Sequence, residues 1–187
     1  LMRGRLVSGT EAHALGLVNH VVPTAEVMDA ATKMAEELNA LPPLAGLNDV
    51  GYLTSDTLWG LREQPKRLVV LGGGPIGCEL AQSFARLGSQ VTQIEMLPRI
   101  MIREDEEVSA FAKKALEHDG VRVLTNHKAL RCERRADGTK AIVVESGGQQ
   151  SAIEFDVLLC AVGRSARLKG FGLEELGIPV NKTVQVN

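Results

Sequence analysis

Three glycines that follow a short apolar run constrain this chain more than any other feature. The apolar run, Leu68–Leu71, predicts a strand buried on both faces of a parallel sheet. Directly after it, Gly72, Gly74 and Gly77 occupy the glycine positions of the pattern G-x-G-x-x-G. In this pattern the first glycine permits a tight turn, the second lets the backbone approach a pyrophosphate, and the third lets a helix pack closely on the strand. The spacing therefore predicts a strand, a turn and a helix that bind a dinucleotide, and the alternative is a glycine turn that only serves packing.

The segment after the glycines predicts a helix whose first N–H groups attract phosphate. The residues expected to face the sheet are Ile76, Leu80, Ala81, Phe84 and Leu87, and Gly88 ends the helix. Val91–Ile94 predicts the next strand, and Glu95 closes it. A carboxylate at this point, about 20 residues beyond the glycines, can bind a ribose 2′-hydroxyl and repels a 2′-phosphate. NAD(H) is therefore expected, although Arg99 leaves NADP(H) open because a nearby arginine can accommodate the phosphate.

The remaining patterns complete an α/β domain. We expect a short helix that is capped by Thr54 or Ser55 and ends at Leu61, and strands at Val121–Leu124 and Asp156–Val162. A longer helix is expected at Glu104–Asp119, with one apolar face formed by Val108, Phe111, Ala112, Ala115 and Leu116. Turn signals at Asp137-Gly138 and Gly147-Gly148 divide the intervening chain into an antiparallel meander. The predicted fold is a Rossmann-like three-layer α/β domain with a parallel sheet, a small antiparallel meander and a helical N-terminal extension.

Composition limits the classes of function. The chain has 187 residues, 44% hydrophobic and 24% charged, with a formal charge of −2. These values predict a soluble globular protein, and they argue against nucleic acid or an anionic membrane as a partner. Cys78, Cys132 and Cys160 are widely spaced and form neither a redox pair nor a metal pattern. We expect buried, reduced thiols in a cytoplasmic protein, with no metal ligands and no catalytic constellation.

The first 45 residues differ from the rest. Their apolar residues between Val27 and Leu41 recur at steps of three and four, which predicts an amphipathic helix. The stretch VSGTEAHALGLVNHVVP resembles the C-terminal part of the enoyl-CoA hydratase (crotonase) family, and the catalytic elements of that family have no counterpart here. Residues 1–45 are therefore interpreted as a helical extension and the whole chain as a fusion or chimera. Two alternative functions for this segment are self-association through the helix and a residual acyl-CoA-binding role.

From about residue 50 the chain is similar to another family. The motifs KRLVVLGGGPIGCELA, VTQIEMLPRIMIREDEEV and FDVLLCAVGR resemble the NAD domain of the pyridine nucleotide-disulphide oxidoreductases, the group of dihydrolipoamide dehydrogenase and mercuric reductase. The resemblance implies three segments: the extension 1–45, a linker with a short helix at 46–64, and an NAD(H)-binding domain at 65–187. It also implies FAD, held in a complete family member by a separate domain.

The resemblance implies roles for individual residues. The pyrophosphate turn of the family is matched by Gly72, Gly74, Gly77 and the backbone of Ile76, and its ribose-binding acid is matched by Glu95. Ala129 falls where the family's backbone meets the adenine, and Gly163 falls where a strand end leaves room for the nicotinamide. Glu79 matches a glutamate at the junction of nicotinamide and flavin, or is a solvated helix residue. The sequence therefore predicts a nucleotide-binding piece of a flavin-dependent oxidoreductase that does not turn over alone, or else an assembly module with a vestigial site.

Overall fold

The computed structural model describes residues 8–10, 21–27, 44–163 and 176–178. The chain divides into two compact units, Leu1–Ala35 and Glu36–Asn187, and each is described by itself. In the first unit, Thr24–Glu26 form a short 3-10 helix, η1. Apart from Val27, the amphipathic helix expected at 27–41 lies outside the described residues, so it stays a prediction.

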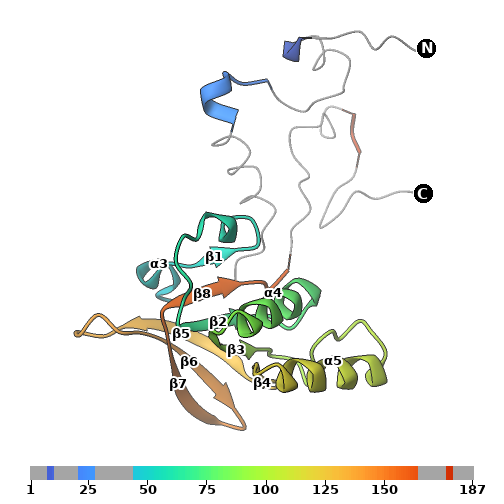
Figure 1. Ribbon diagram of the computed structural model, residues 1–187, viewed down its shortest axis with the longest axis vertical. Helices are drawn as coiled ribbons and strands as arrows, with labels where there is room; N and C mark the ends of the chain where they lie inside the picture. Colours follow the sequence, from blue (N-terminus) through green and yellow to red (C-terminus); the bar gives the residue numbers. More distant parts are fainter. Residues whose placement is uncertain (1–7, 11–20, 28–43, 164–175, 179–187) are drawn as a thin grey trace. The chain divides into compact units, whose positions relative to one another are not determined.

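The second unit is built on a five-stranded sheet in which all neighbouring strands run parallel, in the order β1-β8-β2-β3-β4 (Figure 1). Its strands are β1 Leu53–Thr54, β2 Arg67–Leu71, β3 Gln90–Ile94, β4 Arg122–Leu124 and β8 Val157–Cys160. Helix α4, Pro75–Arg86, lies between β2 and β3 in the chain, and helix α5, Glu106–His118, lies between β3 and β4. The predicted parallel sheet is confirmed, and its four predicted strands begin and end within two residues of the observed bounds.

A three-stranded antiparallel sheet follows β4. It consists of β5 Lys128–Arg134, β6 Lys140–Ser146 and β7 Gln149–Phe155, in that order. The turn between β6 and β7 contains Gly147 and Gly148, both with positive φ (58° and 78°), as a two-residue hairpin turn of this kind requires. The predicted meander is therefore confirmed.

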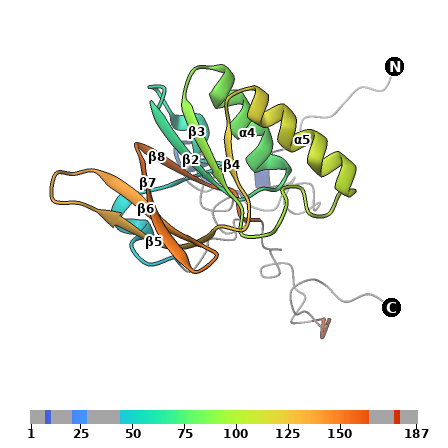
Figure 2. The ribbon, with the colours of Figure 1, turned by 90° about the horizontal axis from the view of Figure 1, so that it is seen from below.

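Alternate residues of the parallel strands face two different layers. Val69 and Leu71 of β2 belong to a core cluster that they share with Ile142 and Phe155 of the antiparallel sheet. Leu68 and Val70 belong to a second cluster, which contains residues of α4 and α5. Figure 2 shows α4 and α5 on one side of the parallel sheet and β5, β6 and β7 on the other. The predicted three-layer α/β fold is confirmed, and it explains why the central strands read as continuous apolar runs.

The predicted buried face of α4 is wrong in part. Ile76 and Leu87 are 37% and 67% exposed, whereas Cys78 and Ala81 are buried. Gly77 is the reason, because its missing side chain brings the helix against β2 along the line of residues 77, 78 and 81. One residue corresponds to 100° of rotation, so Ile76 points away from this line.

The predicted face of α5 also needs correction. Val108 and Phe111 are 47% and 75% exposed. Leu116 is buried as predicted, but Ser109, which was not predicted, is buried as well, and its hydroxyl donates to the carbonyl of Ile100 (2.6 Å). A polar residue can occupy the buried face because its hydrogen bond is satisfied there.

The segment 46–64, expected to be a linker and short helix, contains three short elements. They are α3 Leu47–Val50, the edge strand β1 and the 3-10 helix η2 Leu58–Gly60. Thr54 does not cap a helix, because it lies in β1 and its hydroxyl accepts the N–H groups of Asp56 and Thr57 (3.3 and 3.4 Å). Leu47 and Val50 are buried in the core that faces the antiparallel sheet. This segment is therefore part of the folded domain.

Candidate nucleotide-binding site

The turn from β2 to α4 requires glycine at its first and third pattern positions for different reasons. Gly72 has φ of +116°, and a Cβ there would lie 2.3 Å from the carbonyl oxygen of Ala161. A Cβ at Gly77 would lie 2.3 Å from the carbonyl oxygen of Gly72. Both distances are too short for any side chain. Gly72 is also tied to β3, because its N–H donates to the carbonyl of Ile94 (2.8 Å).

The second pattern glycine is different. Gly74 is the N-cap of α4 with φ of −76°, a conformation open to any residue, and a Cβ there would meet no atom within 4 Å. No side chain caps this helix, and Pro75 occupies its first turn. The open space at Gly74 therefore lies beside the N–H groups of the first turn, including that of Ile76. Such a helix end attracts an anion and leaves room for it.

Glu95 lies against the glycine turn. Its Oε2 accepts the N–H of Gly73 (2.6 Å), and its Oε1 accepts the N–H of Leu97 (2.8 Å). Its main chain is fixed to the next strand, because the Glu95 N–H donates to the carbonyl of Leu124 (2.8 Å). The carboxylate therefore stands at the carboxyl ends of the parallel strands, the edge at which open α/β sheets bind ligands.

Sequence reasoning missed Gly73. A Cβ at this position would lie 2.8 Å from Glu95 Oε2 and 2.9 Å from Ile100 Cγ2. Gly73 thus leaves space for the carboxylate and for the loop that follows β3. The sequence did contain a signal for this requirement. Residues 72–74 are three consecutive glycines, and the pattern G-x-G-x-x-G accounts for Gly72 and Gly74 but not for Gly73.

The loop after β3 folds back onto the turn. The N–H of Met101 donates to the carbonyl of Gly73 (2.6 Å), and Ile100 is fully buried. Arg99 donates from Nη1 to the carbonyl of Glu104 (2.6 Å). Its guanidinium is therefore engaged within the loop backbone.

The other predicted site residues lie in different surroundings. Glu79 is exposed on α4, and within the described part of the chain its carboxylate forms no ion pair. Gly163, with φ of +131° and open space at its Cβ position, follows β8 three residues after Cys160. Ala129 is half-buried on β5, opposite Val144 and beside a break in the strand register. The structure thus brings residues 72–77 and 95 together, whereas Ala129 belongs to the antiparallel sheet.

The three cysteines are buried and free. Burial raises the pKa of Cys132 to about 11 and that of Cys160 to about 12. Burial also raises the pKa of Cys78, whose Sγ lies 3.5 Å from the carbonyl of Gly73. Protonated thiols are poor nucleophiles, so these cysteines are structural at neutral pH. Among the residues that the structure describes, no three His, Cys, Asp or Glu side chains cluster as metal ligands.

A cavity of about 230 Å³ lies at the amino end of β2, away from the glycine turn. Its lining includes Arg67 and Glu154, which pair with each other (2.9 Å), so Arg67 is not free to bind an anion. We therefore assign no ligand to this cavity. Over the described ranges, the chain contains no helix that is both long and apolar enough to cross a bilayer.

A parallel sheet with a glycine turn, an uncapped helix end and an acid on the next strand defines a Rossmann-like nucleotide-binding domain. The sequence profile described as "Pyridine nucleotide-disulphide oxidoreductase" matches residues 38–187. The chain belongs to this family.

Individual relatives agree with the family assignment. The chain is 45% identical over 126 residues to a dihydrolipoyl dehydrogenase of Thermus scotoductus, covering 66% of this chain and 27% of the relative. It is 31% identical over 183 residues to a mitochondrial dihydrolipoyl dehydrogenase of Dictyostelium discoideum, and this match covers 96% of this chain and 37% of the relative. Among solved structures it resembles the HOCl-induced flavoprotein disulfide reductase RclA of Escherichia coli, with a TM-score of 0.65, 33% identity and coverage of 76% and 32%. The chain therefore spans about a third of the length of these relatives.

Proposed function

We propose that this chain is the NAD(H)-binding domain of a flavin-dependent oxidoreductase of this family. One observation carries the proposal: the carboxylate of Glu95 lies 2.6 Å from the Gly73 N–H, at the edge of the glycine turn. From there it can accept a hydrogen bond from a ribose 2′-hydroxyl, while the open backbone at Gly74 and Ile76 receives the pyrophosphate.

Two features support NAD(H) over NADP(H). A carboxylate repels a 2′-phosphate. Arg99, the candidate cation for that phosphate, uses its Nη1 for a hydrogen bond to the backbone of Glu104. Gly163 beside the nicotinamide and Ala129 near the adenine complete the proposed site. Glu79 is proposed either to lie at the junction of nicotinamide and flavin or to be a solvated helix residue.

Exchange of two electrons between NAD(H) and a disulphide is proposed to require FAD from outside the described residues. When bound, the flavin would supply the electron transfer between nicotinamide and disulphide. The three cysteines described here are buried and protonated, so we assign none of them to a redox pair. In this proposal the described residues bind and orient the nucleotide, and the domain alone does not turn over.

The assignments of residues 1–45 have less support. The family profile begins at residue 38, and the relative from Dictyostelium discoideum aligns with 96% of the chain. No finding here supports a crotonase-derived extension or self-association through the helix at 27–41. Both stay predictions, as does the cytoplasmic location.

Titration of the whole chain with NADH and with NADPH tests the proposal. We expect the fluorescence of NADH to change on binding, and a much weaker response to NADPH. Isothermal titration calorimetry provides the second readout, which does not depend on the fluorophore. Absence of NADH binding at millimolar concentration would overturn the proposed function, and equal binding of NADPH would overturn the specificity.

A further inference from the structure

Gln93 is a buried polar residue on β3 that the motif analysis did not single out. It is 0% exposed and belongs to the face of the strand that also carries Val91 and, two residues further on, Glu95. Its Nε2 donates to the carbonyl of Gly72 (3.0 Å). Its Oε1 accepts no hydrogen bond from any of the described residues.

This arrangement is unfavourable for stability taken alone. A buried amide oxygen without a donor loses its hydration and gains no replacement. An apolar side chain of the same size would avoid that loss, but it would leave the Gly72 carbonyl without the Nε2 donor. The amide of Gln93 therefore serves the Gly72 carbonyl, which is a role beyond filling the core.

The Gly72 carbonyl and the Gly73 N–H belong to the same planar peptide unit. Gln93 Nε2 holds the carbonyl end of this unit, and Glu95 Oε2 accepts its N–H (2.6 Å). Two side chains of one strand thus fix opposite ends of a single peptide in the glycine turn. Rotation of this peptide would break both hydrogen bonds together.

We propose that Gln93 is a positioning residue for nucleotide binding: by fixing the Gly72–Gly73 peptide it holds the Glu95 carboxylate in the orientation that binds the ribose. The inference rests on the proposed NAD(H) site. Gln93 lies behind the turn, where a Cβ on Gly77 would be 3.3 Å from its Nε2, so it acts through the peptide and does not touch the nucleotide.

The substitution Gln93→Met tests this role, because methionine matches the length of glutamine and removes both the donor and the unpaired oxygen. We expect NADH affinity to fall about fivefold, while the urea midpoint changes little, because removal of the unpaired oxygen offsets the loss of the donor to the Gly72 carbonyl. Gln90→Met, an exposed position on the same strand, is the matched control and should leave affinity unchanged. A purely structural role predicts unaltered affinity whatever the midpoint, and that result would overturn the inference.

Gln93→Glu adds a pH signature. A protonated glutamic acid can donate to the Gly72 carbonyl, and an ionised one cannot. The ratio of variant to wild-type NADH affinity should therefore fall as pH rises from 5 to 9, and a constant ratio below one would overturn the inference. If this variant does not fold, the methionine variant decides. If wild type binds NADH and Gln93→Met binds equally well, only this inference fails, whereas absence of wild-type binding overturns it together with the proposed function.

Discussion

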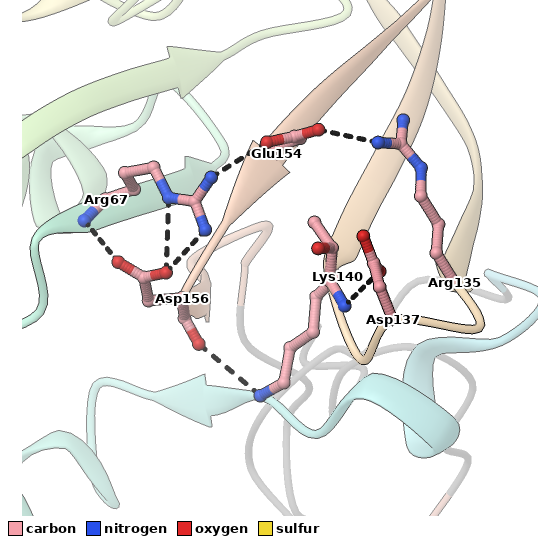
Figure 3. A network of polar contacts seen from close by, with 7 residues as sticks. Arg67, Arg135, Asp137, Lys140, Glu154 and Asp156 are labelled. Carbon is pink, nitrogen blue, oxygen red and sulfur yellow. Dashed lines mark hydrogen bonds and ion pairs between the residues drawn. The ribbon is translucent and has the colours of Figure 1, made fainter.

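The two ends of strand β2 are held in opposite ways. At its amino end, Arg67 donates to Asp156 (2.7 Å) and to Glu154 (2.9 Å), and Glu154 also pairs with Arg135 (2.6 Å) (Figure 3). These side chains are between 37% and 43% exposed. At its carboxyl end, backbone groups and missing side chains fix the turn: Gly72 bonds to Ile94, and a Cβ at residue 72 or 77 would lie 2.3 Å from a backbone oxygen.

The difference shows where the fold tolerates change. Partly exposed ion pairs are screened by water and contribute little each. A backbone turn packed against a helix has no comparable freedom, because an added methyl group meets backbone that cannot move aside. The open space at Gly74 is the exception at the carboxyl end, and it is where the proposed ligand approaches.

Gly77→Ala should have the largest effect on stability. Its Cβ would lie 2.3 Å from the Gly72 carbonyl oxygen, so α4 must move away from β2. We expect the free energy of unfolding to fall by about 3 kcal/mol, measured by urea denaturation. An unchanged midpoint would contradict the close packing at the carboxyl end of β2.

Gly74→Ala should separate binding from folding. The added methyl group meets no protein atom within 4 Å, so the free energy of unfolding should change by less than about 1 kcal/mol. The same methyl group would occupy the space in which the pyrophosphate is proposed to approach. We expect NADH affinity to fall at least about tenfold in a fluorescence titration, a difference of about 1.4 kcal/mol. Wild-type affinity in this variant would place the nucleotide elsewhere.

Glu95→Gln should weaken NADH binding about tenfold, because the ribose 2′-hydroxyl loses its charged acceptor, and it should strengthen NADPH binding, because the charge that repels a 2′-phosphate is removed. The glutamine amide has only one oxygen, so its NH2 group must face the N–H of either Gly73 or Leu97, and one of the two hydrogen bonds is lost. The free energy of unfolding should therefore fall by about 1 kcal/mol. Calorimetric titration with both nucleotides measures the change in preference. A preference for NADH that is unaltered by the substitution would show that Glu95 does not contact the ribose.

Asp156→Asn should have a smaller, pH-dependent effect. The hydrogen bond from Arg67 lowers the pKa of Asp156. A depressed pKa in the folded state means that the stabilisation is present above the unfolded pKa, near 3.9, and is lost as pH falls through the folded value. The variant should therefore lose about 1 kcal/mol at pH 7, after allowance for solvent screening, and progressively less as pH falls below the unfolded pKa. Urea midpoints across this pH range measure it, and a pH-independent loss would exclude the ion pair as the cause.

Glu154→Gln should have the smallest effect. Glu154 bridges Arg67 and Arg135, but its side chain is 43% exposed. We expect a loss below about 0.5 kcal/mol that disappears in 1 M salt, with no change in NADH affinity. A loss comparable to that of Gly77→Ala would show that the contrast between the two ends of β2 is wrong.

Local patterns predicted much of the fold. The parallel strands, the meander and both long helices follow from apolar runs, turn residues and glycines, whose effects depend on near neighbours in the sequence. The edge strand β1 was not predicted, because Leu53 and Thr54 form a strand only through pairing with Leu159 and Cys160, about 100 residues away.

The candidate site divides in the same way. The pattern of glycines and the acid at residue 95 were found from spacing alone, and the structure places that acid against the turn. The need for glycine at position 73 was not found, since it arises from the side chains of Glu95 and Ile100. The exposed positions of Ile76 and Phe111 were also not found, because helical spacing defines a stripe without saying which side meets the sheet.

The sequence by itself determined where β2 ends, that a glycine turn and a helix follow, and that an acid closes the next strand, because these depend on conformational preferences of a few adjacent residues. Only the tertiary structure decided which face of each helix is buried, and that Gln93 and Glu95 hold the two ends of one peptide. Those features depend on how distant segments fit together, and fit is set by volume and hydrogen-bond geometry across the layers of the domain.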